Sequence, residues 1–174
     1  MQNSSQLLVI TASNGENLKL AKRFVNSGNQ MDIKSELIDL TALDLPLYNP
    51  RTHEKEGIPE LAKILNKQLS AIPRWIICAP EYNGSIPPVL TSSIAWLSVQ
   101  GDDFRSLFNG RPIAIASHSG GGGMELLISL RVQLSHLGSL VIGRQLMSNY
   151  KKPASDESID EIIKLLAQVD PLDS

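Results

Sequence analysis

Two short and almost wholly apolar runs constrain the fold of this sequence more than any other feature. They are residues 75–79 (WIICA) and 113–116 (IAIA). A strand that is apolar on both faces belongs in the middle of a parallel sheet, because helices cover such a sheet on both sides. The two runs therefore predict an α/β protein with a buried parallel sheet.

Helical patterns alternate with the strand-like segments along the chain. Strands are also expected over residues 7–13, 32–40 and 139–143, and helices are expected to begin near Glu16, Pro59, Pro87, Met124 and Ser155. This order predicts a doubly wound sheet of five parallel strands, in the order 2-1-3-4-5, with helices on both faces. We expect Asn14 to cap the first helix and residues 27–29 (SGN) to end it. Residues 41–57 and 143–154 are expected to be irregular.

Length and composition limit the classes of function. The 174 residues correspond to one domain, residues 1–174. Sixteen basic and eighteen acidic residues leave a net charge of −2, which offers no field of one sign to attract nucleic acid or anionic lipid. The single cysteine, Cys78, excludes an intramolecular disulfide and fits a reducing compartment. The apolar run at residues 7–10 is too short for a signal sequence or a membrane span, so we expect a cytoplasmic protein without a membrane partner.

Three unusual loops follow the strands that should lie side by side. In an open α/β sheet, ligands bind beyond the carboxyl ends of the strands, where the strand order reverses. In the order 2-1-3-4-5, strands one, three and four are adjacent, so the loops after them converge. The first loop is residues 11–17 (TASNGEN), the second is residues 80–88 (PEYNGSIPP) and the third is residues 117–123 (SHSGGGG). Their convergence predicts the binding site.

Each loop also has a plain structural interpretation. The first loop opens a helix, whose N-terminus favours phosphate, but an ordinary capped turn fits its residues equally well. The run Gly120–Gly123 lets the backbone approach a flat ligand. Its alternative is a flexible tether, which rarely joins a buried strand to an apolar helix. Tyr82 and Asn83 offer an aromatic wall and a polar edge, or only a rigid turn, and His118 is as easily an exposed loop residue as a ligand contact.

Other catalytic signatures are missing from the sequence. It has no Gly-Lys-Ser/Thr phosphate loop, and its glycine run does not follow the first strand, as a dinucleotide fingerprint would. It has neither a GxSxG elbow nor a HExxH pair. Cys78, in a buried strand, fits an inert apolar filler. We therefore expect no catalytic acid or base and no metal ion.

The second and third loops resemble those of a known family. Residues 80–98 (PEYNGSIPPVLTSSIAWLS) are similar to the hallmark segment of the NADPH-dependent FMN reductases, roughly PEYNxSxPxxLKNAIDW. Residues 113–123 (IAIASHSGGGG), 133–138 (QLSHLG) and 43–49 (LDLPLYN) also resemble that family. These proteins have a flavodoxin-like fold and include quinone, chromate and azo-dye reductases, so the resemblance implies this fold here.

The resemblance also implies an NAD(P)H-dependent FMN or quinone reductase. The phosphate of FMN would lie against Ser13 and Asn17, and the flavin ring would lie against the second and third loops. A reduced nicotinamide, from NADPH or NADH, would pass hydride to the flavin, which carries the chemistry. The implied cofactor-binding residues are Ser13, Asn14, Gly15, Asn17, Pro80, Glu81, Tyr82, Asn83, Gly84, Ser85, Ser117, His118, Gly120, Gly121 and Gly122. The implied partners are a small electron acceptor and further copies of the chain, in a homodimer or homotetramer.

The first loop departs from the family pattern GSxRxxSxN. It is shorter and lacks the arginine, which removes a charge-assisted phosphate contact worth roughly 1.5–3 kcal/mol, or about ten- to hundredfold in affinity. Glu16 also adds a negative charge beside the expected phosphate. The alternative function is therefore a degenerate relative that binds flavin or another small ligand without turnover. Electron carriage is less favoured, because flavodoxin carriers are usually strongly acidic and the net charge here is −2.

Overall fold

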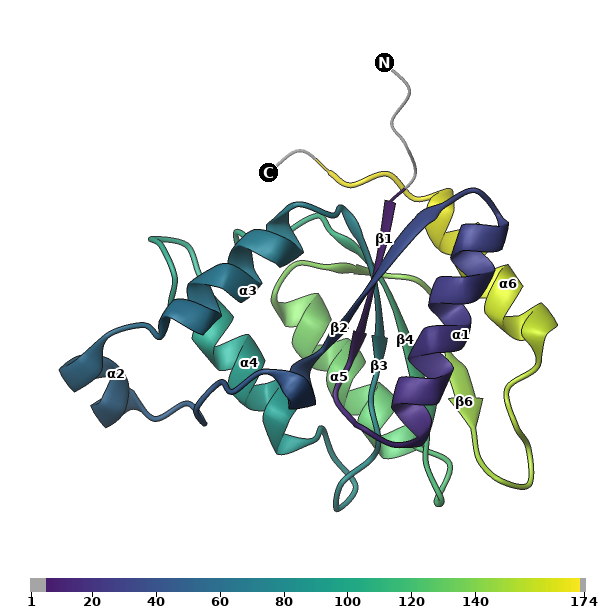
Figure 1. Ribbon diagram of the computed structural model, residues 1–174, viewed down its shortest axis with the longest axis horizontal. Helices are drawn as coiled ribbons and strands as arrows, with labels where there is room; N and C mark the ends of the chain where they lie inside the picture. The colour runs from purple at the N-terminus through teal and green to yellow at the C-terminus, as the bar shows by residue number, and fades with distance from the viewer. Residues whose placement is uncertain (1–5, 173–174) are drawn as a thin grey trace.

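A parallel sheet forms the centre of the protein (Figure 1), which a computed structural model describes over residues 6–172. Its strands are β1 (Gln6–Thr11), β2 (Lys34–Asp39), β3 (Arg74–Cys78), β4 (Pro112–His118), β5 (Leu140–Val141) and β6 (Leu146–Ser148). Their order is β2-β1-β3-β4-β5, β6 also pairs with β4, and every pair is parallel. The predicted strand order is confirmed.

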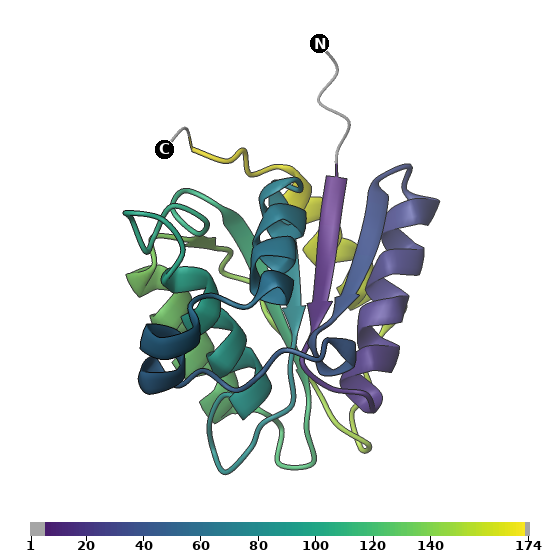
Figure 2. The ribbon, with the colours of Figure 1, turned by 60° about the vertical axis from the view of Figure 1, so that its left-hand side comes forward.

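Helices cover both faces of the sheet (Figures 1 and 2). On one face lie α1 (Glu16–Gln30) and α6 (Asp156–Ala167), and on the other lie α3 (Glu60–Ser70), α4 (Pro88–Ser98) and α5 (Met124–His136). The short helix α2 (Pro50–Glu56) lies outside these layers. Among the described residues, no helix is long and apolar enough to cross a membrane.

The central strands divide their side chains between two apolar cores. In β3, Trp75 and Ile77 pack with α3, α4 and α5, whereas Ile76 and Cys78 pack with α1 and α6. These four side chains are at most 2% exposed, as the unbroken apolar run predicted. Burial raises the pKa of the Cys78 thiol, which fits its interpretation as an inert filler.

Helix α1 differs from its prediction at both ends. It continues through the expected stop to Gln30, and its Gly28 lies close against β2, where a Cβ would overlap Ser35 Oγ. This glycine permits a close helix–strand contact and does not end the helix. At its start, α1 has Gly15 as N-cap with no side-chain cap, so the expectation that Asn14 caps it is wrong.

Residues 41–57 are more regular than expected, because they contain α2 and the end of a 3-10 turn at Leu40–Ala42. The segment is anchored to α4 through Trp96. Trp96 Nε1 donates to the Pro46 carbonyl oxygen at 2.7 Å, and the indole ring packs edge-on against Tyr48, with 4.9 Å between ring centroids. Because α2 has no buried residue, it carries no apolar periodicity that the sequence could reveal.

Residues 143–154 are not wholly irregular either, since β6 lies within them. Strand β4 pairs with β5 through Pro112 and Ile113, and with β6 through residues 116–118. The strand expected over residues 139–143 is present as the shorter β5, and β6 is an additional strand that was not predicted. Strand β6 brings Ser148 to the carboxyl end of β4, beside the third loop.

Candidate functional site

The three loops predicted to form the site lie at one end of the sheet, the lower end in Figure 1. They follow β1, β3 and β4, which are neighbours. The residues just beyond the strands still pair, since the amide of Ala12 donates to the Cys78 carbonyl at 3.1 Å and that of Ala79 donates to the Ala116 carbonyl at 3.1 Å. The loops therefore leave the sheet from fixed and adjacent positions.

The first loop is a tight turn held by its own polar groups. The amide of Gly15 donates to Ser13 Oγ at 3.1 Å, and Thr11 Oγ1 donates to the Ser13 carbonyl at 3.2 Å. The amide of Lys19 bonds to the Gly15 carbonyl, so α1 begins here and the amides of its first turn point out of the helix. The hydrogen bond from Lys19 Nζ, at 2.6 Å, lowers the pKa of the Glu16 carboxyl.

Asn17 is buried and joins the first loop to the third. Its Nδ2 donates to the His118 carbonyl oxygen at 2.8 Å, and the His118 amide donates to Asn17 Oδ1 at 2.8 Å. The residue is only 2% exposed. Both polar atoms of the carboxamide thus have protein partners, and its expected contact with phosphate stays a prediction.

The second loop contains a tight hairpin turn. The backbones of Tyr82 and Ser85 exchange two hydrogen bonds, at 3.0 and 2.9 Å. Between them, Asn83 and Gly84 have φ angles of 51° and 67°. An Asn-Gly pair with positive φ at both positions is typical of a type I′ turn. The turn leaves the Tyr82 side chain 54% exposed, so this ring is available as an aromatic wall.

Glu81 connects the second loop to the third. Its Oε2 accepts a hydrogen bond from the amide of Leu126, in the first turn of α5, at 3.4 Å. Its Oε1 lies 3.7 Å from the position of a Cβ on Gly121. A carboxylate here also complements the positive end of the α5 dipole. Glu81 and the preceding Pro80 are half-buried, and the more exposed part of this loop begins at Tyr82.

The four glycines of the third loop differ in what the fold requires of them. Gly122 and Gly123 have φ angles of +105° and +82°, which favour glycine. A Cβ on Gly123 would also lie 2.5 Å from Ser117 Oγ. Gly120 and Gly121 do not have positive φ, and a Cβ on Gly120 would meet no described atom within 4 Å. Open space beside ordinary backbone is what the approach of a flat ligand needs.

Ser117 and His118 are more buried than a free loop would leave them. Ser117 is fully buried, and its Oγ has no hydrogen-bond partner among residues 6–172. Ser148 Oγ donates to the Ser117 carbonyl at 3.0 Å and lies 3.3 Å from His118 Nδ1. The His118 ring packs edge-on against Tyr150, with 4.9 Å between centroids. His118 is therefore not an exposed loop residue.

Sequence reasoning missed the contribution of β6 and the residues after it. Besides Ser148 and Tyr150, this segment supplies Met147, whose Sδ lies 3.7 Å from the position of a Cβ on Gly122. The three residues lie within the stretch expected to be irregular. Only the pairing of β6 with β4, which joins residues about thirty positions apart, brings them to the site.

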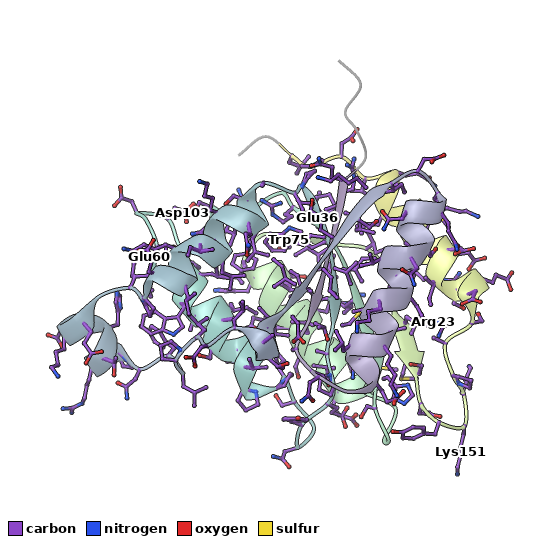
Figure 3. The ribbon with its side chains drawn as sticks, in the orientation of Figure 1. Arg23, Glu36, Glu60, Trp75, Asp103 and Lys151 are labelled. Carbon is purple, nitrogen blue, oxygen red and sulfur yellow. The ribbon has the colours of Figure 1, made fainter. Side chains whose placement is uncertain are left out.

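A hollow of about 230 Å³ separates α1 from the segment after β6. Lys19 and Arg23 line its α1 side. Arg23 (labelled in Figure 3) donates to the Ala154 carbonyl at 2.9 Å and to Asp156 at 2.6 Å. Lys19 pairs with Glu16 and Arg23 pairs with Asp156, so both cations already have partners within the protein.

Comparison with known proteins shows which family this chain belongs to. The sequence model of the family described as NADPH-dependent FMN reductase matches residues 5–152. This chain belongs to that family. The matched range includes all three loops and β6, so the whole candidate site falls within it.

Among the relatives of this chain are two reductases of quinones. The quinone reductase of Escherichia coli (strain K12) is 31% identical over 125 residues, which are 68% of this chain and 65% of that protein. The 2-hydroxy-1,4-benzoquinone reductase of a Burkholderia species is 30% identical over 106 residues, 61% of this chain and 52% of that protein. The chain thus spans 65% and 52% of the lengths of these relatives.

Solved structures confirm the flavodoxin-like fold. The flavoenzyme NAD(P)H:(acceptor) oxidoreductase FerB from Paracoccus denitrificans is similar with a TM-score of 0.76 at 20% identity, covering 95% of this chain and 96% of that one. An archaeal flavodoxin is similar with a TM-score of 0.63 at 12% identity, covering 94% and 95% of the two chains. At these identities the likeness concerns the fold alone.

The residues present fit the FMN of this reductase family on one side better than on the other. The open face at Gly120, the exposed Tyr82 ring and the unpartnered Ser117 Oγ suit a planar group with polar edges. The start of α1 and Ser13 suit a phosphate, but the first loop contributes no arginine or lysine. The site therefore offers suitable contacts for the flavin ring but fewer contacts for the phosphate.

Proposed function

We propose that this protein is an NAD(P)H-dependent reductase that uses FMN to reduce small acceptors such as quinones. The observation that carries the proposal is the pair Gly120 and Gly121, whose lack of side chains the fold does not require, at the rim of β1, β3 and β4. Membership of the FMN reductase family supports the same function. When bound, FMN supplies the redox chemistry, taking a hydride from NADPH or NADH and passing electrons to the acceptor.

The chain's own residues would bind and orient the cofactor. Ser13, Asn14, Gly15 and the first-turn amides of α1 would hold the phosphate, helped by the helix dipole. The ring would lie between the second loop, residues 80–85, and the third loop at Ser117, His118 and Gly120–Gly122. Because Asn17 and Glu81 brace the third loop against its neighbours, the ring would lie against loops whose positions are already fixed.

One observation favours a second candidate, a flavin-binding protein without turnover. The first loop has no cation, and the nearest ones on α1 are paired with Glu16 and Asp156. The phosphate would then rest on neutral donors alone, which are roughly half as strong as charge-assisted ones. A weakly held flavin could act as a substrate or leave the protein before it reacts.

The acceptor that best fits the rim is a small planar apolar molecule. Tyr82, Met124 and Met147 are exposed by 54%, 43% and 43%, around loops that otherwise offer backbone and small side chains. Such a rim favours an apolar ring over a charged acceptor.

We also place the protein in the cytoplasm, because its free buried thiol fits a reducing compartment and its electron donor is a soluble coenzyme.

A homodimer is part of the proposal. Helix α5 carries a stripe of apolar side chains four residues apart, Met124, Ile128 and Val132, which are exposed by 43%, 55% and 65%. An apolar helix face of this kind marks an interaction surface. Val132→Asp should therefore convert the protein to a monomer in analytical ultracentrifugation, whereas Leu165→Asp, at an exposed apolar residue of α6, should leave the dimer intact.

The test of the function separates ligand approach from folding. Gly120→Val should weaken FMN binding at least about tenfold, since the side chain would occupy the space of the ring, and should leave the melting temperature unchanged. Gly143→Val is the matched control, because Gly143 is also exposed, lacks positive φ and has no atom of residues 6–172 within 4 Å of its Cβ position. FMN fluorescence quenching measures binding, and NADPH oxidation in the presence of a quinone measures turnover.

The outcomes distinguish the candidates. FMN binding without NADPH oxidation would favour the protein without turnover. Equal FMN affinity of Gly120→Val and the unsubstituted protein would place the site elsewhere, and the reductase proposal would then lose its main support.

A further inference from the structure

His118, the last residue of β4, has backbone groups that no strand within residues 6–172 satisfies on the β3 side. Strand β3 pairs with β4 as far as Cys78 and Ala116, and the Ala116 carbonyl accepts from the amide of Ala79. Alternate residues of a strand direct their N–H and C=O groups to the same side. His118 therefore directs both groups toward β3 at a level where β3 has already ended. Buried and unpaired, these groups would cost free energy.

The side chain of Asn17 takes the place of the missing strand residue. Its carboxamide accepts from the His118 amide and donates to the His118 carbonyl, both at 2.8 Å, as a peptide group of an adjacent strand would. The two residues are 101 positions apart. Because Asn17 stands in the first turn of α1, this pair of bonds fixes the start of α1 directly against the start of the third loop.

We propose that Asn17 is a positioning residue, which sets the distance between the phosphate side and the ring side of the site, and not a direct ligand of the phosphate. Its two polar atoms are used within the protein, and at 2% exposure the side chain offers no open face to a ligand. The phosphate is left to the main-chain amides of the first turn and to Ser13. This inference rests on the proposed function for its ligand, but the bonds themselves are a property of the free protein.

The substitution Asn17→Leu tests the inference with little change of shape. Leucine has the same branched arrangement of heavy atoms as asparagine, but its methyl groups neither donate nor accept hydrogen bonds. Both backbone groups of His118 should therefore lose their partners. Asn17→Ala is a second neutral variant that removes the same two bonds.

Two measurements follow on these variants. In the free protein, the hydrogen-exchange protection of the His118 amide should fall at least about tenfold in Asn17→Leu, after correction for the intrinsic rate. The variant should also bind FMN and riboflavin more weakly by similar factors, since a displaced loop affects the ring whether or not phosphate is present. Asn26→Leu, at an exposed position of α1, is the control and should change neither quantity.

Several results would overturn the inference. Unchanged protection of the His118 amide in Asn17→Leu would contradict the double hydrogen bond. A loss of affinity confined to FMN, with riboflavin unaffected, would make Asn17 a phosphate ligand. If Asn17→Leu does not fold, the same two measurements on Asn17→Ala decide the question. If the unsubstituted protein binds neither flavin, the proposed function fails, while the protection of the His118 amide still tests the loop contact by itself.

Discussion

The first and third loops stand at the same rim of the sheet, yet they meet a ligand in different ways. In the first loop, the side chains of Ser13, Glu16 and Asn17 all bond to the protein itself. In the third loop, Gly120 and Gly121 leave the backbone bare beside open space. The first loop is thus built for its own rigidity, and the third loop for contact with something outside the chain.

This difference indicates where binding energy comes from. A ring that packs against Gly120 and Tyr82 gains apolar contact without disturbing any existing bond. A phosphate at the first loop must use main-chain amides and compete with Glu16 for positive charge. We therefore expect the ring to supply more of the affinity than the phosphate, the reverse of a site with an arginine in its first loop.

The largest effect should come from breaking the third loop itself. Gly123→Ala should lower the free energy of unfolding by about 3 kcal/mol, because its φ of +82° strains other residues and the Cβ would press on the buried Ser117. Gly120→Ala should change it by less than about 0.5 kcal/mol, since neither condition applies there. Urea denaturation measures both. Equal stability of the two variants would show that the glycines do not divide into structural and ligand-facing pairs.

The next effect concerns the missing cation of the first loop. Asn14 is exposed at the tip of this loop, and Asn14→Arg should strengthen FMN binding about tenfold or more through a charge-assisted contact with the phosphate. The gain should shrink in high salt and should be absent for riboflavin, which has no phosphate. Asn26→Arg, farther along α1, is the control for net charge. An equal gain with both arginines would mean that general attraction, and not a contact at the first loop, is responsible.

The sequence alone predicts those parts of the molecule whose signals are local. The runs at residues 75–79 and 113–116 predict central strands because both faces of each strand are buried, and from them follows the rim where the three loops meet. The turn at Asn83 and Gly84 follows from a dipeptide that favours positive φ. Each of these features depends on neighbouring residues, and each can be read without knowledge of the rest of the fold.

What the sequence could not predict depends on distant contacts. Gly28 looks like the end of a helix until β2 lies against it. Helix α2 buries no residue and therefore has no periodic pattern, and β6 is a strand only because β4 extends beside it. The role of Asn17 is hidden for the same reason, since it depends on where β3 ends relative to His118. The sequence thus predicts which loops share this rim, but not which contacts their individual residues make.

The smallest effect should come from Glu16, the negative charge of the first loop. Glu16→Gln should strengthen FMN binding about two- to threefold in low salt, because it removes repulsion of the phosphate that Lys19 only partly offsets. The hydrogen bond from Lys19 lowers the pKa of Glu16, so the carboxyl stays charged from pH 8 to pH 5. The ratio of affinities should nevertheless be smaller at pH 5, because a phosphate monoester has a second pKa of about 6 and carries less negative charge there. By the same sign, the stability that the Glu16–Lys19 pair contributes is present above the unfolded pKa of Glu16 and is lost only as the pH falls through its lower folded pKa.

Isothermal titration with FMN measures the ratio of the two affinities, with Glu54→Gln on α2 as control. A weaker affinity of Glu16→Gln would instead show that this carboxylate matters to the first loop as a partner that holds Lys19 in place.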